Sequence, residues 1–95
     1  IAHIPARIAG ADFDAWIATE RTSIAGKIGE TVSLIPLTAQ VEDIVTSGLQ
    51  FPLRNETLVL GSPRGMSNTL SLTRAEVAFA SGMLFVVHTQ MTADR

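Results

Sequence analysis

The chain has 95 residues, of which 46% are hydrophobic, and a formal net charge of −2 from seven basic and nine acidic side chains. This length corresponds to one domain, and the composition is that of a folded chain rather than a disordered one. A protein without a basic surplus is not expected to bind nucleic acid. Without cysteine it can form neither a disulfide nor a thiolate zinc site, which agrees with a cytoplasmic location.

The sequence predicts neither a membrane-spanning helix nor a signal peptide. The longest uninterrupted apolar run covers only residues 83–87, whereas a membrane-spanning helix needs about 20 residues. No signal peptide is visible at the N-terminus. Because the sequence begins with Ile1 rather than Met, we interpret it as part of a longer protein, either processed or excised as a domain.

Alternation of apolar and polar residues, with turn residues every eight to twelve positions or so, predicts an all-β domain. Short strands are expected over residues 4–8, 12–22, 23–25, 31–37, 41–47, 57–60, 67–72, 75–80 and 83–89. Nine or ten such strands imply a two-sheet β-sandwich or a jelly-roll-like barrel that occupies residues 1–95 as a single domain.

Several segments carry more specific expectations. For residues 12–22 a short helix is the alternative, but β-branched side chains favour a strand. The strand 83–89 is apolar on both faces, so we expect the core to cover one face and another subunit the other. Residues 54–56 are a predicted turn and residues 81–82 a tight hairpin turn. Residues 91–95 are expected to form a flexible tail.

The histidines and carboxylates of the sequence are not spaced in any arrangement suited to catalysis. The two histidines, His3 and His88, are far apart and lack patterned carboxylates nearby, so we expect neither a serine triad nor a metal site. His88 is interpreted as a structural or edge residue. Glu42 and Asp43 are adjacent and would point to opposite faces of a strand, which excludes a paired acid and base. We therefore assign no catalytic and no metal-binding residue.

The loop at residues 61–68, GSPRGMSN, is the most distinctive segment. Its glycines permit unusual backbone angles, and Ser67 and Asn68 can both donate and accept hydrogen bonds. The loop is interpreted as a polar binding loop on a β-scaffold, with a plain turn as the alternative. Arg64 is expected to be exposed, with contact to an anion as the alternative. Phe51 is interpreted as a core residue or as a ring that stacks on a ligand.

Five blocks of the sequence closely resemble the C-terminal domain of bacterial thiamine pyrophosphokinases in order and spacing. They are residues 29–36 (GETVSLIP), 47–53 (SGLQFPL), 55–60 (NETLVL), 61–68 (GSPRGMSN) and 80–87 (ASGMLFVV). The resemblance extends over roughly residues 24–88, and residues 1–23 match weakly.

This resemblance implies that the chain is the thiamine-binding β-domain of a longer two-domain enzyme. The reaction would transfer the pyrophosphoryl group of ATP to the hydroxyl of thiamine, giving thiamine diphosphate and AMP. An N-terminal α/β domain would bind Mg²⁺ and ATP, and the β-domain would contribute to the thiamine pocket and to a homodimer. The 95-residue chain alone would hold no cofactor and would be inactive.

The resemblance also assigns thiamine-site residues. Ser67 and Asn68 match the Ser-Asn pair of the family and would line the thiamine site. Phe51 stands where the family often has tyrosine or tryptophan, so the ring is kept and the polar group is lost. Gly65 and Met66 would supply backbone and apolar contact to a ring, and Arg64 completes the candidate set.

A different class of function remains open on the residues alone. A non-enzymatic β-sandwich module that only mediates assembly would also explain the doubly apolar strand and the lack of catalytic groups. A cupin-like metal or sugar binder is disfavoured because a histidine cluster is missing.

Overall fold

The computed structural model describes residues 3–8 and 10–90, and these residues form β-strands and no helix. The strands are β1 (Ile4–Ile8), β2 (Ala11–Ala18), β3 (Arg21–Ala25), β4 (Thr31–Pro36), β5 (Gln40–Ser47), β6 (Arg54–Val59), β7 (Asn68–Thr69), β8 (Arg74–Ala78) and β9 (Leu84–Gln90). No helix able to cross a membrane occurs in this part of the chain. The predicted all-β class is confirmed.

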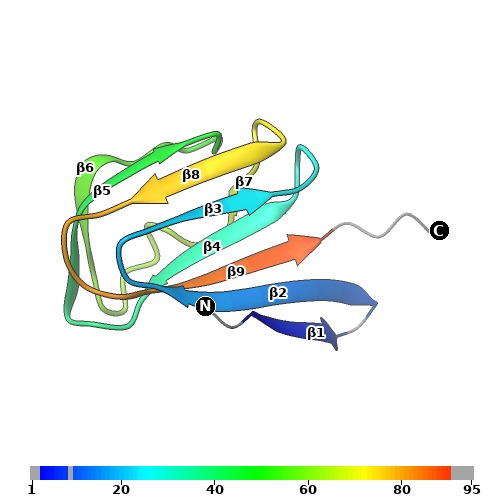
Figure 1. Ribbon diagram of the computed structural model, residues 1–95, viewed down its shortest axis with the longest axis horizontal. Coiled ribbons are helices and arrows are strands. Elements are labelled where there is room, and N and C mark those ends of the chain that lie inside the picture. The colour runs from blue at the N-terminus through cyan, green and yellow to red at the C-terminus, as the bar shows by residue number, and fades with distance from the viewer. Residues whose placement is uncertain (1–2, 9, 91–95) are drawn as a thin grey trace.

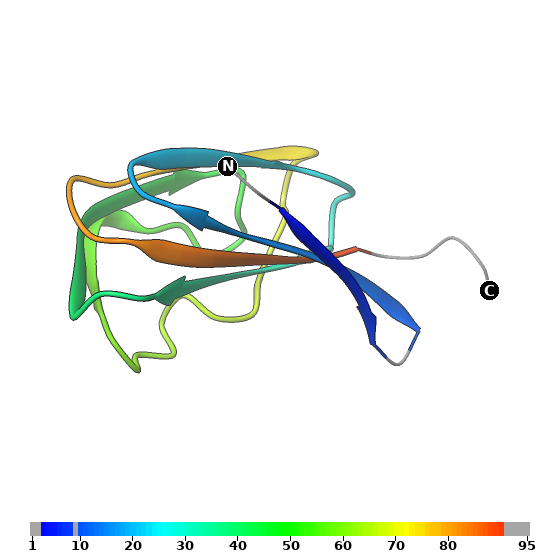
Figure 2. The ribbon, with the colours of Figure 1, turned by 60° about the horizontal axis from the view of Figure 1, so that its bottom comes forward.

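The strands form two antiparallel sheets that pack as a sandwich (Figure 1). The five-stranded sheet has the order β1-β2-β9-β4-β7, and the four-stranded sheet has the order β3-β8-β5-β6. The β1–β2 hairpin forms one edge of the five-stranded sheet, and the end of β1 and the start of β2 extend beyond the four-stranded sheet (Figure 2). The short strand β7 forms the opposite edge and leads directly out of the loop at residues 61–68.

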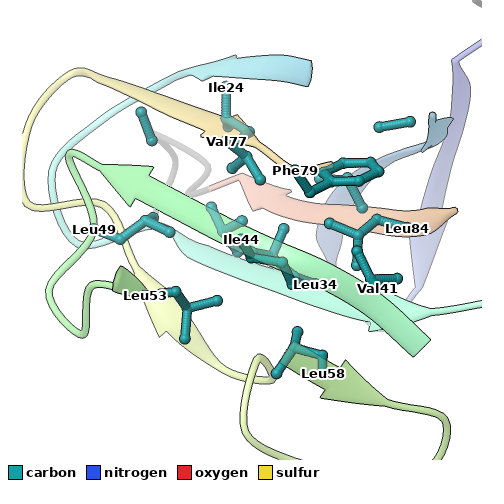
Figure 3. Packing of buried hydrophobic residues seen from close by; sticks show 14 of the residues in the cluster. Ile24, Leu34, Val41, Ile44, Leu49, Leu53, Leu58, Val77, Phe79 and Leu84 are labelled. Carbon is teal, nitrogen blue, oxygen red and sulfur yellow. The ribbon is translucent and has the colours of Figure 1, made fainter. Parts of the chain in front are cut away.

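The core lies between the sheets because alternate residues of each strand point inward. Val32 and Leu34 of β4 are buried, whereas Ser33 and Ile35 between and after them are partly exposed. Figure 3 shows Leu34 and the inward side chains of the other sheet pointing toward one another. Each buried side chain of this size stabilises the fold by about 1.5–3 kcal/mol relative to an exposed one.

Residues 12–22 form a strand rather than a helix, but the strand ends earlier than expected. β2 ends at Ala18, and the chain crosses to the other sheet before β3 begins at Arg21. Trp16 and Ala18 are buried on the five-stranded sheet and Ile24 on the four-stranded sheet. One continuous strand could not place these residues in both layers, so the chain bends at residues 19–20.

The two turns predicted at residues 54–56 and 81–82 are wrong. Residues 54–56 belong to β6, where Asn55 has a φ of 56° and the pairing with β5 shifts register. Residues 81–82 do not close a hairpin, because β8 and β9 lie in different sheets. The predicted strand 67–72 is reduced to β7, and the predicted tail 91–95 lies outside the described residues.

β9 is the central strand of its sheet, which explains its apolar character. Leu84, Val86 and His88 point into the sandwich and are buried. Phe85 and Val87 lie on the opposite face and are partly exposed. The expectation that another subunit covers this second face stays a prediction.

Candidate functional site

The loop at residues 61–68 runs along the free side of β4 before it becomes β7. The Leu34 N–H donates to the Gly65 carbonyl at 2.8 Å, and the Ser67 N–H donates to the Ser33 hydroxyl at 3.1 Å. Asn68 and Thr69 then pair with Val32 and Thr31 of β4. The loop is therefore attached to the edge of the five-stranded sheet and does not extend freely into solvent.

Gly65 makes this close attachment possible. It is buried, and a Cβ atom at this position would lie 2.6 Å from the Leu34 carbonyl oxygen and 3.0 Å from Leu58 Cδ1. Both distances are shorter than ordinary van der Waals contacts, so a side chain would force the loop away from β4. The structure thus places Gly65 beneath the loop as a packing residue.

A second segment, residues 48–51, pairs with residues 68–71 in a short two-stranded ribbon. The Gln50 N–H donates to the Thr69 carbonyl at 2.9 Å, and the Ser71 N–H donates to the Gly48 carbonyl at 2.8 Å. Leu49 and Leu70 form a β-bridge between them. This ribbon brings Phe51 next to the end of the loop, although 17 residues separate Phe51 from Asn68.

The carboxamide of Asn68 holds the backbone of Phe51 at both of its polar groups. Asn68 Oδ1 accepts the Phe51 N–H at 3.0 Å, and Asn68 Nδ2 donates to the Phe51 carbonyl at 2.7 Å. Oδ1 also accepts the Thr69 N–H at 3.0 Å. Asn68 is only 2% exposed, whereas Phe51 is 55% exposed. The Asn68 side chain is therefore directed at Phe51, whose ring is presented to solvent.

Arg64 forms an ion pair with Glu56, a residue that the sequence had placed in a turn. Nε of Arg64 donates to Glu56 Oε1 at 3.1 Å, and Nη2 donates to Oε2 at 3.0 Å. Both side chains are partly exposed, so the pair stabilises the fold by at most about 1 kcal/mol. The guanidinium lies at the rim of the loop with part of its charge compensated.

Three groups remain presented to solvent around the end of the loop: the ring of Phe51, the thioether of Met66 and the hydroxyl of Ser67. Within the described ranges the Ser67 hydroxyl makes no hydrogen bond, and Ser67 has a φ of 58°. An aromatic face and a thioether suit a flat or cationic ring, and a hydroxyl can bond its polar edge. We define Phe51, Met66, Ser67 and Asn68 as the loop-end cluster.

The loop-end cluster forms an open surface. Residues 3–8 and 10–90 enclose no pocket, and they contain no group of three or more His, Cys, Asp or Glu side chains suited to a metal. The cluster has no base beside its serine. Such an open surface can contact only one side of a ligand.

One buried pair of titratable residues, Glu30 and His88, is not indicated by any pattern in the sequence. Nε2 of His88 lies 2.6 Å from Glu30 Oε1, and both side chains are only 4% exposed. His88 was expected to be a structural or edge residue, and no role was assigned to Glu30. Its partner is 58 positions away, which no local pattern could reveal.

Comparisons with known proteins relate this sandwich to one family. The sequence model of the thiamin pyrophosphokinase, vitamin B1 binding domain family matches residues 19–84. The thiamine pyrophosphokinase of Bacillus subtilis (strain 168) is 32% identical over 56 residues, which are 59% of this chain and 26% of that protein.

Solved structures show the same fold. The crystal structure of thiamine pyrophosphokinase from Bacillus subtilis has a TM-score of 0.76 and 22% identity, over 84% of this chain and 39% of that one. That of thiamin pyrophosphokinase from Geobacillus thermodenitrificans has a TM-score of 0.74 and 20% identity, over 85% and 39%. The chain thus spans about two-fifths of these structures.

The fold defines a small all-β sandwich domain with the loop-end cluster exposed on its surface. The family match extends over more than half of the chain. The chain belongs to the thiamin pyrophosphokinase, vitamin B1 binding domain family.

Proposed function

We propose that this chain is the thiamine-binding domain of a thiamine pyrophosphokinase, which transfers the pyrophosphoryl group of ATP to the hydroxyl of thiamine and releases AMP. Family membership supports the substrate. The observation that carries the site is the exposed Phe51 ring, held by the Asn68 carboxamide beside the open end of the loop.

The chemistry of thiamine suits the loop-end cluster. Thiamine joins a positively charged thiazolium ring to an aminopyrimidine with hydrogen-bonding edges. Phe51 offers an aromatic face to either ring, and attraction of a cation to such a face contributes about 0.5–2 kcal/mol. Met66 adds apolar contact, and the Ser67 hydroxyl bonds a polar edge.

The remaining candidate residues have supporting roles in this proposal. Asn68 fixes the backbone of Phe51, and Gly65 holds the loop against β4. Arg64, paired with Glu56, forms the rim of the site. None of these residues is assigned a catalytic step.

We place Mg²⁺ and ATP on a separate α/β domain of the same enzyme. The donor set of this chain does not fit them, because its described residues contain no cluster of acidic or imidazole ligands. Metal ions and cationic groups that hold the phosphates are what pyrophosphoryl transfer requires. By this reasoning the 95-residue chain alone is inactive, and the lack of cysteine is in keeping with a cytoplasmic enzyme.

We further propose that the domain forms a homodimer through the outer face of the five-stranded sheet. Cross-strand rows on β2, β9 and β4 make up this face: Ile17–Phe85–Ile35, Ala15–Val87–Ser33 and Phe13–Thr89–Thr31. None of these residues is charged, and Ile17 is 44% exposed. A twofold contact brings the same surface of two subunits together, so an uncharged face avoids repulsion between like charges.

The thiamine assignment is tested by Phe51→Ala in the full-length enzyme. Loss of the ring removes about 1–2 kcal/mol of binding, so the KM for thiamine should rise about 5- to 30-fold while the KM for ATP stays constant. Phe51→Tyr keeps the ring and should restore the KM. Leu72→Ala, at a residue of similar exposure outside the cluster, is the matched control.

Equal and small changes in both KM values for Phe51→Ala would contradict the site. If, in addition, the full-length protein neither bound thiamine nor consumed ATP but still associated, the non-enzymatic assembly module would be the better description. The uncharged outer face is the observation that favours that second function.

A further inference from the structure

A buried pair of polar side chains, Glu30 and His88, lies at the end of the sandwich where β4 begins. Glu30 precedes β4, and His88 points inward from β9, with 2.6 Å between Glu30 Oε1 and His88 Nε2. Glu30 Oε1 also accepts the Lys27 N–H at 3.0 Å. Both side chains are almost completely removed from solvent. The carboxylate is thus bonded to two different segments of the chain.

Gly26 leaves the space that the pair occupies. A Cβ atom at Gly26 would collide with Glu30 Oε1 and would lie 2.8 Å from His88 Nε2. The Gly26 N–H donates to the Thr73 carbonyl at 2.9 Å, so this backbone cannot move aside without losing a bond. The segment at residues 26–30 is therefore shaped around the pair.

A buried pair of polar side chains is not an efficient way to stabilise a core. Removing two polar groups from water costs much of what the hydrogen bond between them returns. Such a pair can instead define one conformation, because a buried polar group that loses its hydrogen-bond partner is costly. The conformation that this pair defines includes the main chain at Glu30, which is bonded to other segments.

The main chain at Glu30 is bonded to the ribbon that carries Phe51. The Leu70 N–H donates to the Glu30 carbonyl at 2.9 Å, and the Gly29 N–H donates to the Leu70 carbonyl at 2.8 Å. Leu70 forms the bridge to Leu49, and the preceding Thr69 accepts the Gln50 N–H. Phe51 follows directly. A displacement of Glu30 would thus reach Phe51 through consecutive backbone hydrogen bonds.

We propose that Glu30 and His88 form a positioning pair that sets the location of the loop-end cluster, and through it the affinity for thiamine, without touching the ligand. This inference rests on the proposed thiamine-binding function. A displacement of about 1 Å at a binding group can reduce function by up to about 100-fold. A contact in the core that fixes the position of Phe51 therefore affects the affinity for thiamine.

The test compares Glu30→Ala, Glu30→Gln and Val77→Ala in the full-length enzyme. Glu30→Ala should raise the KM for thiamine about tenfold and leave the KM for ATP unchanged. Glu30→Gln keeps an oxygen within reach of His88 and the Lys27 N–H, so it should restore most of the thiamine affinity. Val77→Ala truncates a buried side chain of the four-stranded sheet and controls for loss of stability. It should leave both KM values unchanged.

Hydrogen exchange of the Leu70, Gln50 and Phe51 amides provides a readout that does not depend on thiamine. Exchange at these amides should accelerate in Glu30→Ala and stay slow in Val77→Ala. If Glu30→Ala changes neither the exchange nor the thiamine KM, or changes both KM values as Val77→Ala does, the pair is only structural. If Phe51→Ala leaves the thiamine KM unchanged, the proposed site fails, and the exchange rates alone decide the positioning role.

Discussion

Asn68 shows how a polar residue of a proposed binding loop can support the fold rather than contact the ligand. Its carboxamide makes three hydrogen bonds, all to main-chain groups, and two of them bracket Phe51. The adjacent Ser67 is exposed. Two neighbouring polar residues therefore have different proposed roles. Asn68 supports the backbone of Phe51, and Ser67 is a candidate contact with thiamine.

Substitution of each residue separates these roles. Asn68→Ala removes three hydrogen bonds, so the free energy of unfolding should fall by about 2–4 kcal/mol, and the thiamine KM should rise far more than the ATP KM. Ser67→Ala should change the free energy of unfolding by less than about 0.5 kcal/mol and affect only the thiamine KM. Urea denaturation and steady-state kinetics measure the two quantities. An unchanged stability for Asn68→Ala would contradict the supporting role.

The strand pair β5–β6 shows why residues 54–56 looked like a turn. Asn55 has a φ of 56°, and Asp43 on the paired strand also has a φ of 56°. Asparagine and aspartate tolerate this left-handed region better than other non-glycine residues. The same residue types favour turns, so the sequence could not distinguish a bulge within two strands from a loop between them.

This account predicts opposite outcomes for two substitutions of Asn55. Asn55→Gly should leave the free energy of unfolding within about 0.5 kcal/mol of its original value, because glycine adopts positive φ freely. Asn55→Val should lower it by about 1–2 kcal/mol, because a β-branched residue is strained there. Thermal unfolding followed by circular dichroism is a suitable measurement. Equal losses for both variants would show that the Asn55 side chain, not its backbone, matters.

At the scale of the whole molecule, the two outer faces of the sandwich differ. The face of the five-stranded sheet carries the rows that include Ile17, Phe85 and Ile35, and these rows lack charge. The face of the four-stranded sheet carries the exposed charged residues Glu42, Arg54 and Glu76. Large uncharged apolar faces mark contact surfaces more often than solvated ones.

The proposed dimer is tested by matched substitutions on these two faces. Ile17 and Val45 are both 44% exposed, on β2 and β5 respectively. Ile17→Asp would bury a charge twice in a twofold contact, so the dissociation constant should rise about 100-fold or more. Val45→Asp should have no effect. Sedimentation velocity over a range of concentrations distinguishes the outcomes, and equal behaviour of both variants would rule out this interface.

Much of the fold could be predicted from the sequence because strand alternation is local. The inward residues of β4 and β8, such as Leu34 and Val77, follow the period of two that a half-buried strand requires. The predicted strand at residues 31–37 therefore ends within one residue of Pro36, the observed end of β4. The residues of the candidate site were expected from the family blocks, and Phe51 and Asn68 do lie together.

The connections between the sheets and the contacts between distant segments could not be predicted, because they depend on which strands share a sheet. The pair at residues 81–82 looked like a hairpin turn, yet Gly82, with a φ of 100°, lies in a crossing between the two layers. A Cβ atom there would lie 2.5 Å from the Gln40 carbonyl oxygen. The residues next to Gly82 in the sequence do not indicate this contact, because its partner Gln40 lies far away in the sequence, at the start of β5.

The sequence by itself determined the all-β class, the inward and outward residues of most strands, and the family to which the domain belongs. These follow from neighbours along the chain and from the order of short blocks. The tertiary structure alone decided that Asn68 holds Phe51, that Arg64 pairs with Glu56, and that Glu30 meets His88 in the core. Each of these contacts joins different segments, and strand pairing brings such segments together only once both sheets have formed.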